Sequence, residues 1–340
     1  MKPRIIGGFD AQVDRYPYAQ VSLQYRGSHY CGGSLLAPDI VLTAAHCSDS
    51  FDKIQFNRYN LKNTSEHVET LRPVELFWHP LYNESLYHYD ILIVKLDSPV
   101  SVIEPVRINR LPDVPRNGQE LTAVGWGLTE VNEDDSYSDI LQGVSVRYIP
   151  TDVCKTIRDG AGTVFGEYLT PDMLCAADRG KDSCYGDSGS PLIALGAGPE
   201  QDVQVGIVSW GIDCAGVFPG VYSRLSQSFD WIEQTICAQS QDPPIYFRCS
   251  SPTPSNSPRP TSASSNPPSL PSPSRRVSDE PSSMPGSQNK EVDIAGQEEA
   301  STSSIQGSPN DLLRKSGGFD KPVVMTFLLI LLSCVQEVAY

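Results

Sequence analysis

The chain has 340 residues and a formal net charge of −15. Residues 1–249 carry 19 Lys and Arg against 32 Asp and Glu, which argues against nucleic acid as a partner, because phosphate binding needs basic side chains. Eight of the nine cysteines precede residue 250 and none forms a CxxC pair, so the pattern argues against zinc and predicts disulfides made in an oxidising, extracellular compartment.

Short apolar or alternating runs, broken by Gly, Pro, Asn and Asp, recur along the first 225 residues. The runs expected to form strands are 19–25, 33–37, 39–45, 90–96, 120–127, 143–149, 191–195, 203–211 and 220–225. One helix is expected at 229–237, capped by Ser226 or Ser228, with Phe229, Ile232 and Ile236 on one face. Many strands without a second helical layer predict an all-β protein, and the length suits two barrels.

The C-terminal third has a different composition. Residues 250–318 contain no Phe, Trp or Tyr and open with a tract of Ser, Pro, Thr and Asn, so we expect a disordered stalk that suits O-glycosylation. The final segment, 319–340, contains the apolar run 322–335, which is short for a membrane span. It is read as a GPI-attachment signal, as a transmembrane anchor, or as an incidental apolar end.

The N-terminal residues, MKPRIIGG, contain no apolar signal region, although a disulfide-rich protein needs one to leave the cytosol. Two interpretations stay open: the natural start lies upstream, or this is an alternative form of the chain. The sequons at Asn63 and Asn83 fit a secreted or cell-surface glycoprotein.

Three chemically complementary residues stand in separate motifs. His46 follows the apolar run of LTAAHC, Asp90 precedes ILIVKL, and Ser188 lies between two glycines in CYGDSGSP. A serine hydroxyl needs a base to remove its proton, imidazole has a suitable pKa, and a carboxylate fixes the imidazole tautomer. His, Asp, Ser is one of the chain orders found in serine hydrolases. We therefore expect nucleophilic catalysis by these three side chains.

These motifs, with RIIGG, HPLYN, VGWG, GIVSWG and PGVYSRL in this order, resemble the trypsin-like serine proteases of the chymotrypsin fold from Ile5 to about Ile236. The resemblance implies two six-stranded antiparallel β-barrels with a C-terminal helix, in an endopeptidase. We expect a monomer that uses no cofactor, and we assign no metal ligands. Together with the composition of the C-terminal third, the resemblance divides the chain into a propeptide remnant (1–4), a protease domain (5–237), a small cysteine-closed extension (238–249), the disordered Ser/Pro-rich stalk (250–318) and the hydrophobic segment (319–340).

The resemblance also implies how the protease is activated. An activating protease would cleave the Arg4–Ile5 bond, and the freed Ile5 ammonium would pair with Asp187. That pair would set the loop whose Gly186 and Ser188 amides form the oxyanion hole. With the bond intact, the chain is expected to be an inactive precursor.

Substrate selection is implied by Asp182, six residues before the nucleophile. A buried carboxylate at the pocket floor pairs with Arg or Lys of a protein or peptide substrate. Ser183 would add a hydrogen bond, Gly211 and Gly220 would line the walls, and the backbone from Ser209 to Gly211 would pair with an extended peptide.

The family pattern pairs Cys31 with Cys47, Cys154 with Cys175, and Cys184 with Cys214. A further family bridge is missing at both ends, where Leu121 and Ala194 stand. Cys237 and Cys249 are left over and are expected to close a small loop after the helix, while Cys334 lies in the apolar tail.

The chain also departs from the family pattern. Ser190 replaces a usual glycine, and Tyr185 and Asp213 near the pocket entrance are expected to alter which neighbouring substrate residues are accepted. The family's calcium loop would fall at 57–69, where Glu66 and Glu69 lack convincing ligand spacing.

Two alternatives from other classes remain open at this point. One is a pseudoprotease, a catalytically weak chain that keeps the fold as a binding scaffold. The other is a cell-surface interaction module in which the Ser/Pro stalk is the functional part.

Overall fold

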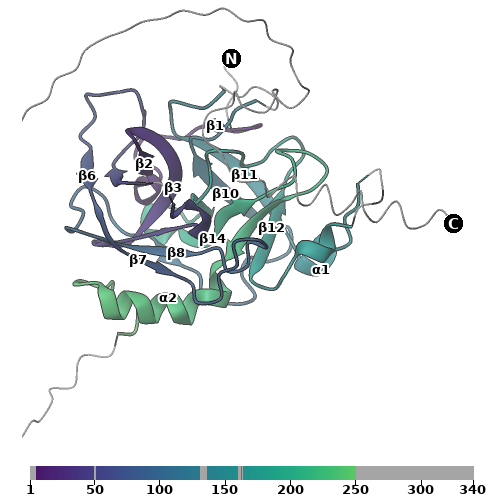
Figure 1. Ribbon diagram of the computed structural model, residues 1–340. Coiled ribbons are helices and arrows are strands. Elements are labelled where there is room, and N and C mark those ends of the chain that lie inside the picture. The colour runs from purple at the N-terminus through teal and green to yellow at the C-terminus, as the bar shows by residue number, and fades with distance from the viewer. Residues whose placement is uncertain (1–4, 50, 131–135, 160–161, 163, 250–340) are drawn as a thin grey trace, which may run out of the picture. The chain divides into compact units, whose positions relative to one another are not determined.

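The computed structural model describes residues 5–49, 51–130, 136–159, 162 and 164–249 (Figure 1). The expected propeptide remnant, stalk and hydrophobic C-terminal segment lie outside the described residues. Among the residues described, no helix is both long enough and apolar enough to cross a membrane.

The N-terminal half of the described chain forms a curled, seven-stranded antiparallel sheet in the order β6-β5-β2-β3-β4-β8-β7 (Figure 1). Its strands are β2 (Val21–Tyr25), β3 (Ser28–Ala37), β4 (Ile40–Thr43), β5 (Lys53–Phe56), β6 (Glu69–Leu71), β7 (Pro73–Trp78) and β8 (Leu92–Leu96). Apolar side chains such as Leu23, Ile54 and Phe56 are fully buried inside the curl, and polar side chains alternate with them along β5.

The second half closes into a ring of six antiparallel strands within the described residues, because β11 pairs with both β10 and β12. The ring contains β10 (Glu120–Gly125), β11 (Gln142–Ile149), β12 (Met173–Ala177), β13 (Pro191–Ala194), β14 (Val203–Trp210) and β15 (Gly220–Arg224). Two short strands extend it: β1 (Phe9–Asp10) pairs with β11, and β9 (Arg107–Ile108) pairs in parallel with β14. The predicted all-β architecture is confirmed, as one closed barrel and one curled half-barrel.

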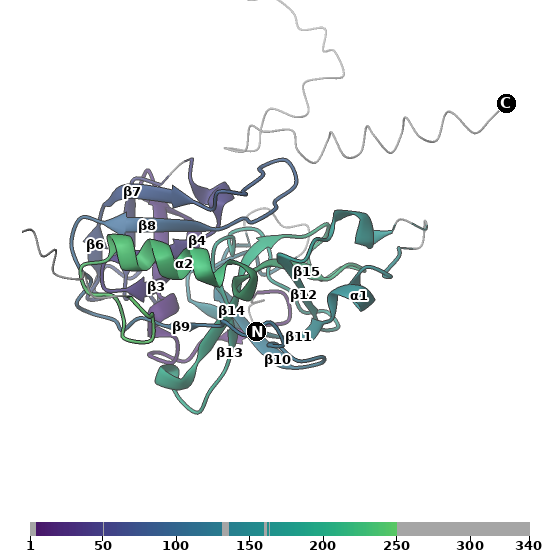
Figure 2. The ribbon, with the colours of Figure 1, turned by 90° about the horizontal axis from the view of Figure 1, so that it is seen from below.

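Helices are few in the described chain, and all but α2 have at most four residues. They are the single-turn α1 (Thr151–Cys154), the 3₁₀ turns η1 (Pro17–Ala19), η2 (Ala45–Cys47), η3 (Phe165–Tyr168) and η4 (Pro199–Gln201), and the C-terminal α2 (Leu225–Gln239). Helix α2 packs against β8 and β14 (Figure 2) and buries the expected face of Phe229, Ile232 and Ile236.

The expected cap of α2 is wrong. The helix begins at Leu225, directly after β15, so its N-cap is Arg224 and no side chain caps it. Ser226 and Ser228 therefore lie inside the first turns, where their hydroxyls are buried without a described hydrogen-bond partner. The continuous passage from strand to helix overrides the local preference of serine for a cap.

The segment after α2 folds back onto the N-terminal half. Cys237 and Cys249 form a disulfide, Phe247 is buried with its ring centroid 6.2 Å from that of Phe229, and the Tyr246 hydroxyl donates to the Val106 carbonyl at 2.9 Å. This disulfide-closed extension covers apolar surface that the sheet would otherwise expose.

Candidate active site

The register of β4 and β8 brings His46 and Asp90 together. Thr43 at the end of β4 stands opposite Leu92 at the start of β8, so the residues that follow Thr43 and those that precede Leu92 leave the sheet at the same edge. His46 lies in the 3₁₀ turn after β4, and its Nδ1 is 2.7 Å from Asp90 Oδ2. The His46 backbone N–H donates to the other carboxylate oxygen at 2.9 Å.

The second barrel fixes Asp90 from the opposite side. Ser209 Oγ of β14 donates to Asp90 Oδ2 at 2.6 Å, and Ser223 Oγ of β15 donates to the Asp90 carbonyl at 2.9 Å. Only a backbone role was expected for Ser209, because a contact between barrels leaves no local pattern in the sequence. With no exposed surface, Asp90 is held by donors from both halves of the molecule.

Electrostatics give His46 and Asp90 opposite pKa shifts. Burial acts to lower the pKa of His46, but the charge of Asp90 and its hydrogen bond outweigh burial and raise that pKa above its ordinary value. Burial acts to raise the pKa of Asp90, but the charge of His46 and hydrogen bonds from His46 and Ser209 lower it. Asp90 therefore stays ionised, Nδ1 carries a proton toward it, and Nε2 is left as the basic nitrogen.

Ser188 lies in a turn that packs against the same edge. Its carbonyl accepts the Gly32 N–H at 2.8 Å, and Gly189 donates to the Val208 carbonyl at 3.0 Å. Gly189 has φ of +79°, and a Cβ there would overlap Thr43 Oγ1, three residues before His46. The half-buried Ser188 hydroxyl makes no hydrogen bond to a described residue, His46 included. Such nucleophile–base bonds often tighten only in the substrate complex.

Two backbone amides of this turn are available to a ligand. The Asp187 and Gly189 amides donate to the carbonyls of Cys184 and Val208, whereas the amides of Gly186 and Ser188 donate to no described residue. Gly186 has φ of +92°, a left-handed conformation that suits glycine. Two free N–H groups beside a hydroxyl can stabilise an oxyanion.

His29, which sequence analysis did not single out, holds the back of this turn. Its Nε2 is 3.0 Å from the Gly186 carbonyl and its Nδ1 is 2.8 Å from Ser22 Oγ. Burial lowers the pKa of His29 to about 4, against the Gly186 hydrogen bond, so the ring is neutral and Nε2 carries the proton donated to Gly186. The signal in sequence was only a histidine two residues before Cys31.

Asp187 is a buried carboxylate that has no cationic partner among the described residues. It is 1% exposed and accepts the N–H groups of Gly127 at 2.8 Å and Cys184 at 2.9 Å. Burial raises its pKa to about 7, although these two hydrogen bonds act to lower it. Ile5 is fully buried in the core cluster of the second barrel, which also contains Leu121 and Val144.

Asp182 is a second buried carboxylate of this kind, 2% exposed. Its Oδ2 accepts the Ala215 N–H at 3.0 Å, and its Oδ1 has no hydrogen-bond partner among the described residues. Burial raises its pKa to about 7, opposed by the Ala215 and Ser183 amides and assisted by the charge of Asp187. A ligand that donates hydrogen bonds could satisfy this buried oxygen.

One glycine stands directly beside the unpaired Asp182 oxygen, and another borders open space. A Cβ on Gly220 would lie 2.6 Å from Asp182 Oδ1, and a Cβ on Gly211 would meet nothing within 4 Å. Ser183 Oγ is 3.0 Å from the hydroxyl of Tyr222, a β15 residue that sequence analysis missed. The Cys184–Cys214 disulfide links the segment that contains Asp182 and Ser183 to the segment that contains Ala215.

The other expected pairs, Cys31–Cys47 and Cys154–Cys175, are also formed. Cys31 and Cys47 lie near His46, and the ligand atoms of the three lie within 4.8 Å of one another. Because both sulfurs are bonded to each other, they are not available as thiolate ligands.

The loop at 57–69 does not fit a calcium ion. The Glu66 carboxylate accepts the backbone N–H groups of Tyr59 and Asn60 at 3.2 and 2.8 Å and lies 3.6 Å from the Arg58 guanidinium. Arg58 also donates to the Leu61 and Asn63 carbonyls. The Arg58 guanidinium therefore already binds carbonyl oxygens of this loop and lies beside the Glu66 carboxylate, and a calcium ion would need oxygen ligands of this kind.

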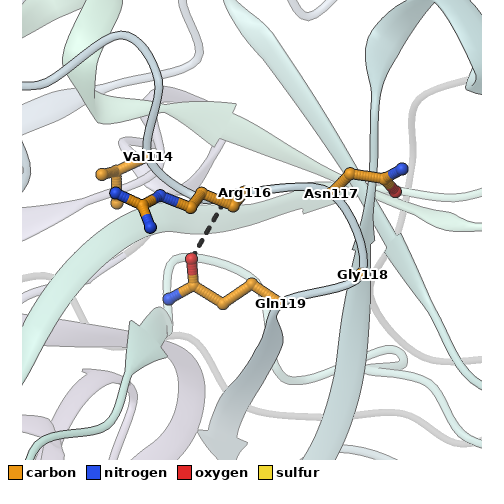
Figure 3. A pocket seen from close by; sticks show the side chains of 5 residues that line it. All are labelled: Val114, Arg116, Asn117, Gly118 and Gln119. Atoms are coloured by element: carbon orange, nitrogen blue, oxygen red, sulfur yellow. Dashed lines mark hydrogen bonds between the residues drawn. The ribbon is translucent and has the colours of Figure 1, made fainter.

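The described residues form a surface hollow beside His46 and another one away from it. One, of about 230 Å³, is lined by His46 together with Ala45, Ser48, Asp49, Trp78, Tyr82 and Glu84. The other lies at the turn before β10 and is lined by Val114, Arg116, Asn117, Gly118 and Gln119 (Figure 3). None of those five residues was singled out by sequence analysis, and the Arg116 N–H donates to the Gln119 side chain across it.

The sequence of the chain is similar to that of known serine proteases of the trypsin family. The family model described as Trypsin matches residues 5–232. Trypsin epsilon of Drosophila erecta is 38% identical over 240 residues, which cover 68% of this chain and 87% of that protein. Hypodermin-B of Hypoderma lineatum is 35% identical over 68% of this chain and 87% of its own length. Trypsin of Sus scrofa is 34% identical over 69% of this chain and 96% of its own length.

Proposed function

The chain belongs to the trypsin family of serine proteases, and on that premise we propose that it is an endopeptidase that hydrolyses peptide bonds after Arg or Lys. The observation that carries the specificity is the buried Asp182 oxygen without a donor. A guanidinium or ammonium group of the substrate would donate a hydrogen bond to that oxygen and remove the free-energy cost of an unpaired buried carboxylate.

The proposed chemistry is acyl transfer. Ser188 Oγ attacks the carbonyl carbon of the peptide bond while His46 Nε2 takes the hydroxyl proton, and Asp90 stabilises the imidazolium. The oxygen that gains negative charge accepts the Gly186 and Ser188 N–H groups. His46 then gives its proton to the leaving amine, an acyl ester remains on Ser188, and water hydrolyses it by the same steps.

The extended part of the substrate would pair with backbone near β14. Ser209 contacts Asp90, and a Cβ on Gly211 would meet nothing within 4 Å, which supports addition of a substrate strand along the backbone from Ser209 to Gly211. Ser183 would add a hydroxyl beside the substrate cation.

We infer that the enzyme is made as a precursor and is activated by cleavage between Arg4 and Ile5 by another protease. The support is Asp187, whose buried carboxylate lacks a described cation and whose pKa is raised to about 7. A new Ile5 ammonium would compensate that charge and hold the turn that carries Gly186.

We also propose the arrangement outside the catalytic domain. Residues 5–237 are the protease and 238–249 a disulfide-closed extension, followed by a Ser/Pro-rich stalk and a hydrophobic segment that tethers the protein to a membrane. Four disulfides among the described residues support an extracellular location. Glycans on Asn63, Asn83 and the stalk belong to this proposal.

The test is kinetics on peptide amides that differ only in Arg, Lys, Phe or Ala before the cut bond, measured after cleavage at Arg4. Turnover of the Arg and Lys amides, abolished in Ser188→Ala, supports the proposal. Preference for Phe would overturn the specificity, and no turnover by correctly cleaved protein would favour a binding scaffold.

A further inference from the structure

A carboxylate of the second barrel binds the backbone next to Asp90. Asp172, in the loop before β12, is 5% exposed, and its Oδ2 accepts the Tyr89 N–H at 2.7 Å. Its own carbonyl accepts the Arg224 N–H at 2.7 Å, where β15 passes into α2. Asp172 is therefore fixed on one half of the molecule while it holds the Asp90 loop of the other half.

The backbone that Asp172 holds is strained. Tyr87 has φ of +53° and Tyr89 has φ of +48°, a left-handed conformation that bulky residues adopt only when their surroundings impose it. A relaxed Tyr89 would change the direction of the chain one residue before Asp90. A second contact acts on the same residue: the His79 ring stacks on the Tyr89 ring at 4.4 Å with an interplanar angle of 8°.

The consequence falls on the hydrogen bonds of Asp90. Its two carboxylate oxygens must meet His46 N and Nδ1 at once, at 2.9 and 2.7 Å, so a small rotation of the Tyr89–Asp90 peptide breaks one of them. Ser209 and Ser223 bind Asp90 itself but do not determine the backbone angles of Tyr89.

We propose that Asp172 is a positioning residue for the reaction: it holds Tyr89 in its left-handed conformation and so keeps the Asp90 carboxylate aligned with His46. The inference rests on the proposed function, because its kinetic consequence is a consequence for acyl transfer. Asp172 acts through Tyr89 and Asp90 and touches neither substrate nor the reacting atoms.

The first test is kinetic, on full-length protein cleaved at Arg4. Asp172→Ala should lower kcat about 10- to 100-fold, the size of effect expected when a catalytic group is displaced by about 1 Å, with KM changed less than about twofold. Asp172→Asn should retain kcat within about threefold of the parent, because the amide oxygen still accepts the Tyr89 N–H.

The matched control is Asp39→Ala. Asp39 is also a buried carboxylate, 3% exposed, that accepts a backbone N–H, from Gln241 at 2.9 Å, but it holds the end of α2. The Asp39→Ala substitution should lower the melting temperature without lowering kcat. An unchanged kcat in Asp172→Ala, a loss confined to KM, or an equal loss of kcat in Asp39→Ala would overturn the inference.

The second test needs no turnover. The pKa of His46 is measured by NMR titration in the Ser188→Ala chain, with and without Asp172→Ala. Asp90 is the group that raises this pKa, and the other titratable groups near His46 include Tyr87, Tyr82, Asp49 and Glu84. Misalignment of Asp90 should bring the pKa of His46 down toward its ordinary value of about 6.5.

The two tests separate the possible failures. If the cleaved parent protein hydrolyses no substrate, the proposed function fails while the titration still decides the role of Asp172. If the parent is active and the pKa of His46 is the same with and without Asp172, only the positioning role fails.

Discussion

Replacing Asp182 by Asn tests the proposed pocket without changing its shape. The amide oxygen can still accept the Ala215 N–H, but the substrate cation would lose the carboxylate oxygen that has no other described donor. Removing one partner of a buried, hydrogen-bonded charge pair costs about 2–5 kcal/mol. At about 1.36 kcal/mol per tenfold, kcat/KM for an Arg substrate should fall between about 30- and 5,000-fold.

The assay compares kcat/KM for two peptide amides that differ only in Arg or Phe before the cut bond. The kcat/KM for the Arg substrate should fall between about 30- and 5,000-fold, whereas the kcat/KM for the Phe substrate should change less than about threefold. Asp230→Asn, on α2, is the control, because it removes an exposed, screened charge and should leave both values within about threefold. Equal losses for Arg and Phe, or no loss for Arg, would refute the assignment of Asp182 as the pocket floor.

The same substitution has a consequence for stability whose sign follows from the pKa. Asp182 has a folded-state pKa raised to about 7, so the folded protein holds this proton more tightly than the unfolded chain does. Between about pH 4 and pH 7 this group therefore lowers stability as pH rises. Asp182→Asn should raise the melting temperature of ligand-free protein at pH 8 and change it little at pH 4.

Three further predictions concern other parts of the site. Gly189→Ala should lower the melting temperature and abolish fluorophosphonate labelling of Ser188, because the new Cβ overlaps Thr43 at a left-handed φ; normal labelling would contradict the packing of that turn. Cleavage after Arg4 should raise the melting temperature more at pH 8 than at pH 5, because the unpaired Asp187, with pKa about 7, is costly only when ionised; an equal rise at both pH values would argue against an Ile5–Asp187 pair. A calcium chelator should leave the melting temperature unchanged, whereas Arg58→Gln should lower it by about 2–4 °C, the shift for about 1 kcal/mol in a domain of this size; a chelator effect in the parent would show that Arg58 does not replace a metal.

Residues that act through their own short motif were predictable from sequence. Gly186 and Gly189 frame a serine, and the apolar runs before His46 and after Asp90 place these two side chains at strand ends that pair in the sheet. The alternation of buried and polar residues also predicted the strands, since it follows the two faces of a sheet.

Residues that act across the interface between the two halves were not predictable. Asp172 contacts Tyr89 over 83 positions and Ser209 contacts Asp90 over 119, and no local spacing records such a pair. The start of α2 was missed for a related reason: the chain enters the helix straight from β15, so the usual capping signal is absent. His29 and Tyr222 likewise depend on tertiary contacts.

The central claim is tested most directly by trapping the acyl ester. Protein cleaved at Arg4 is mixed with an arginine ester that deacylates slowly, and the modified peptide is located by mass spectrometry. The proposed mechanism predicts one acyl group per chain, on Ser188, that is absent in His46→Ala. An acyl group on another residue, or labelling that does not depend on His46, would contradict it.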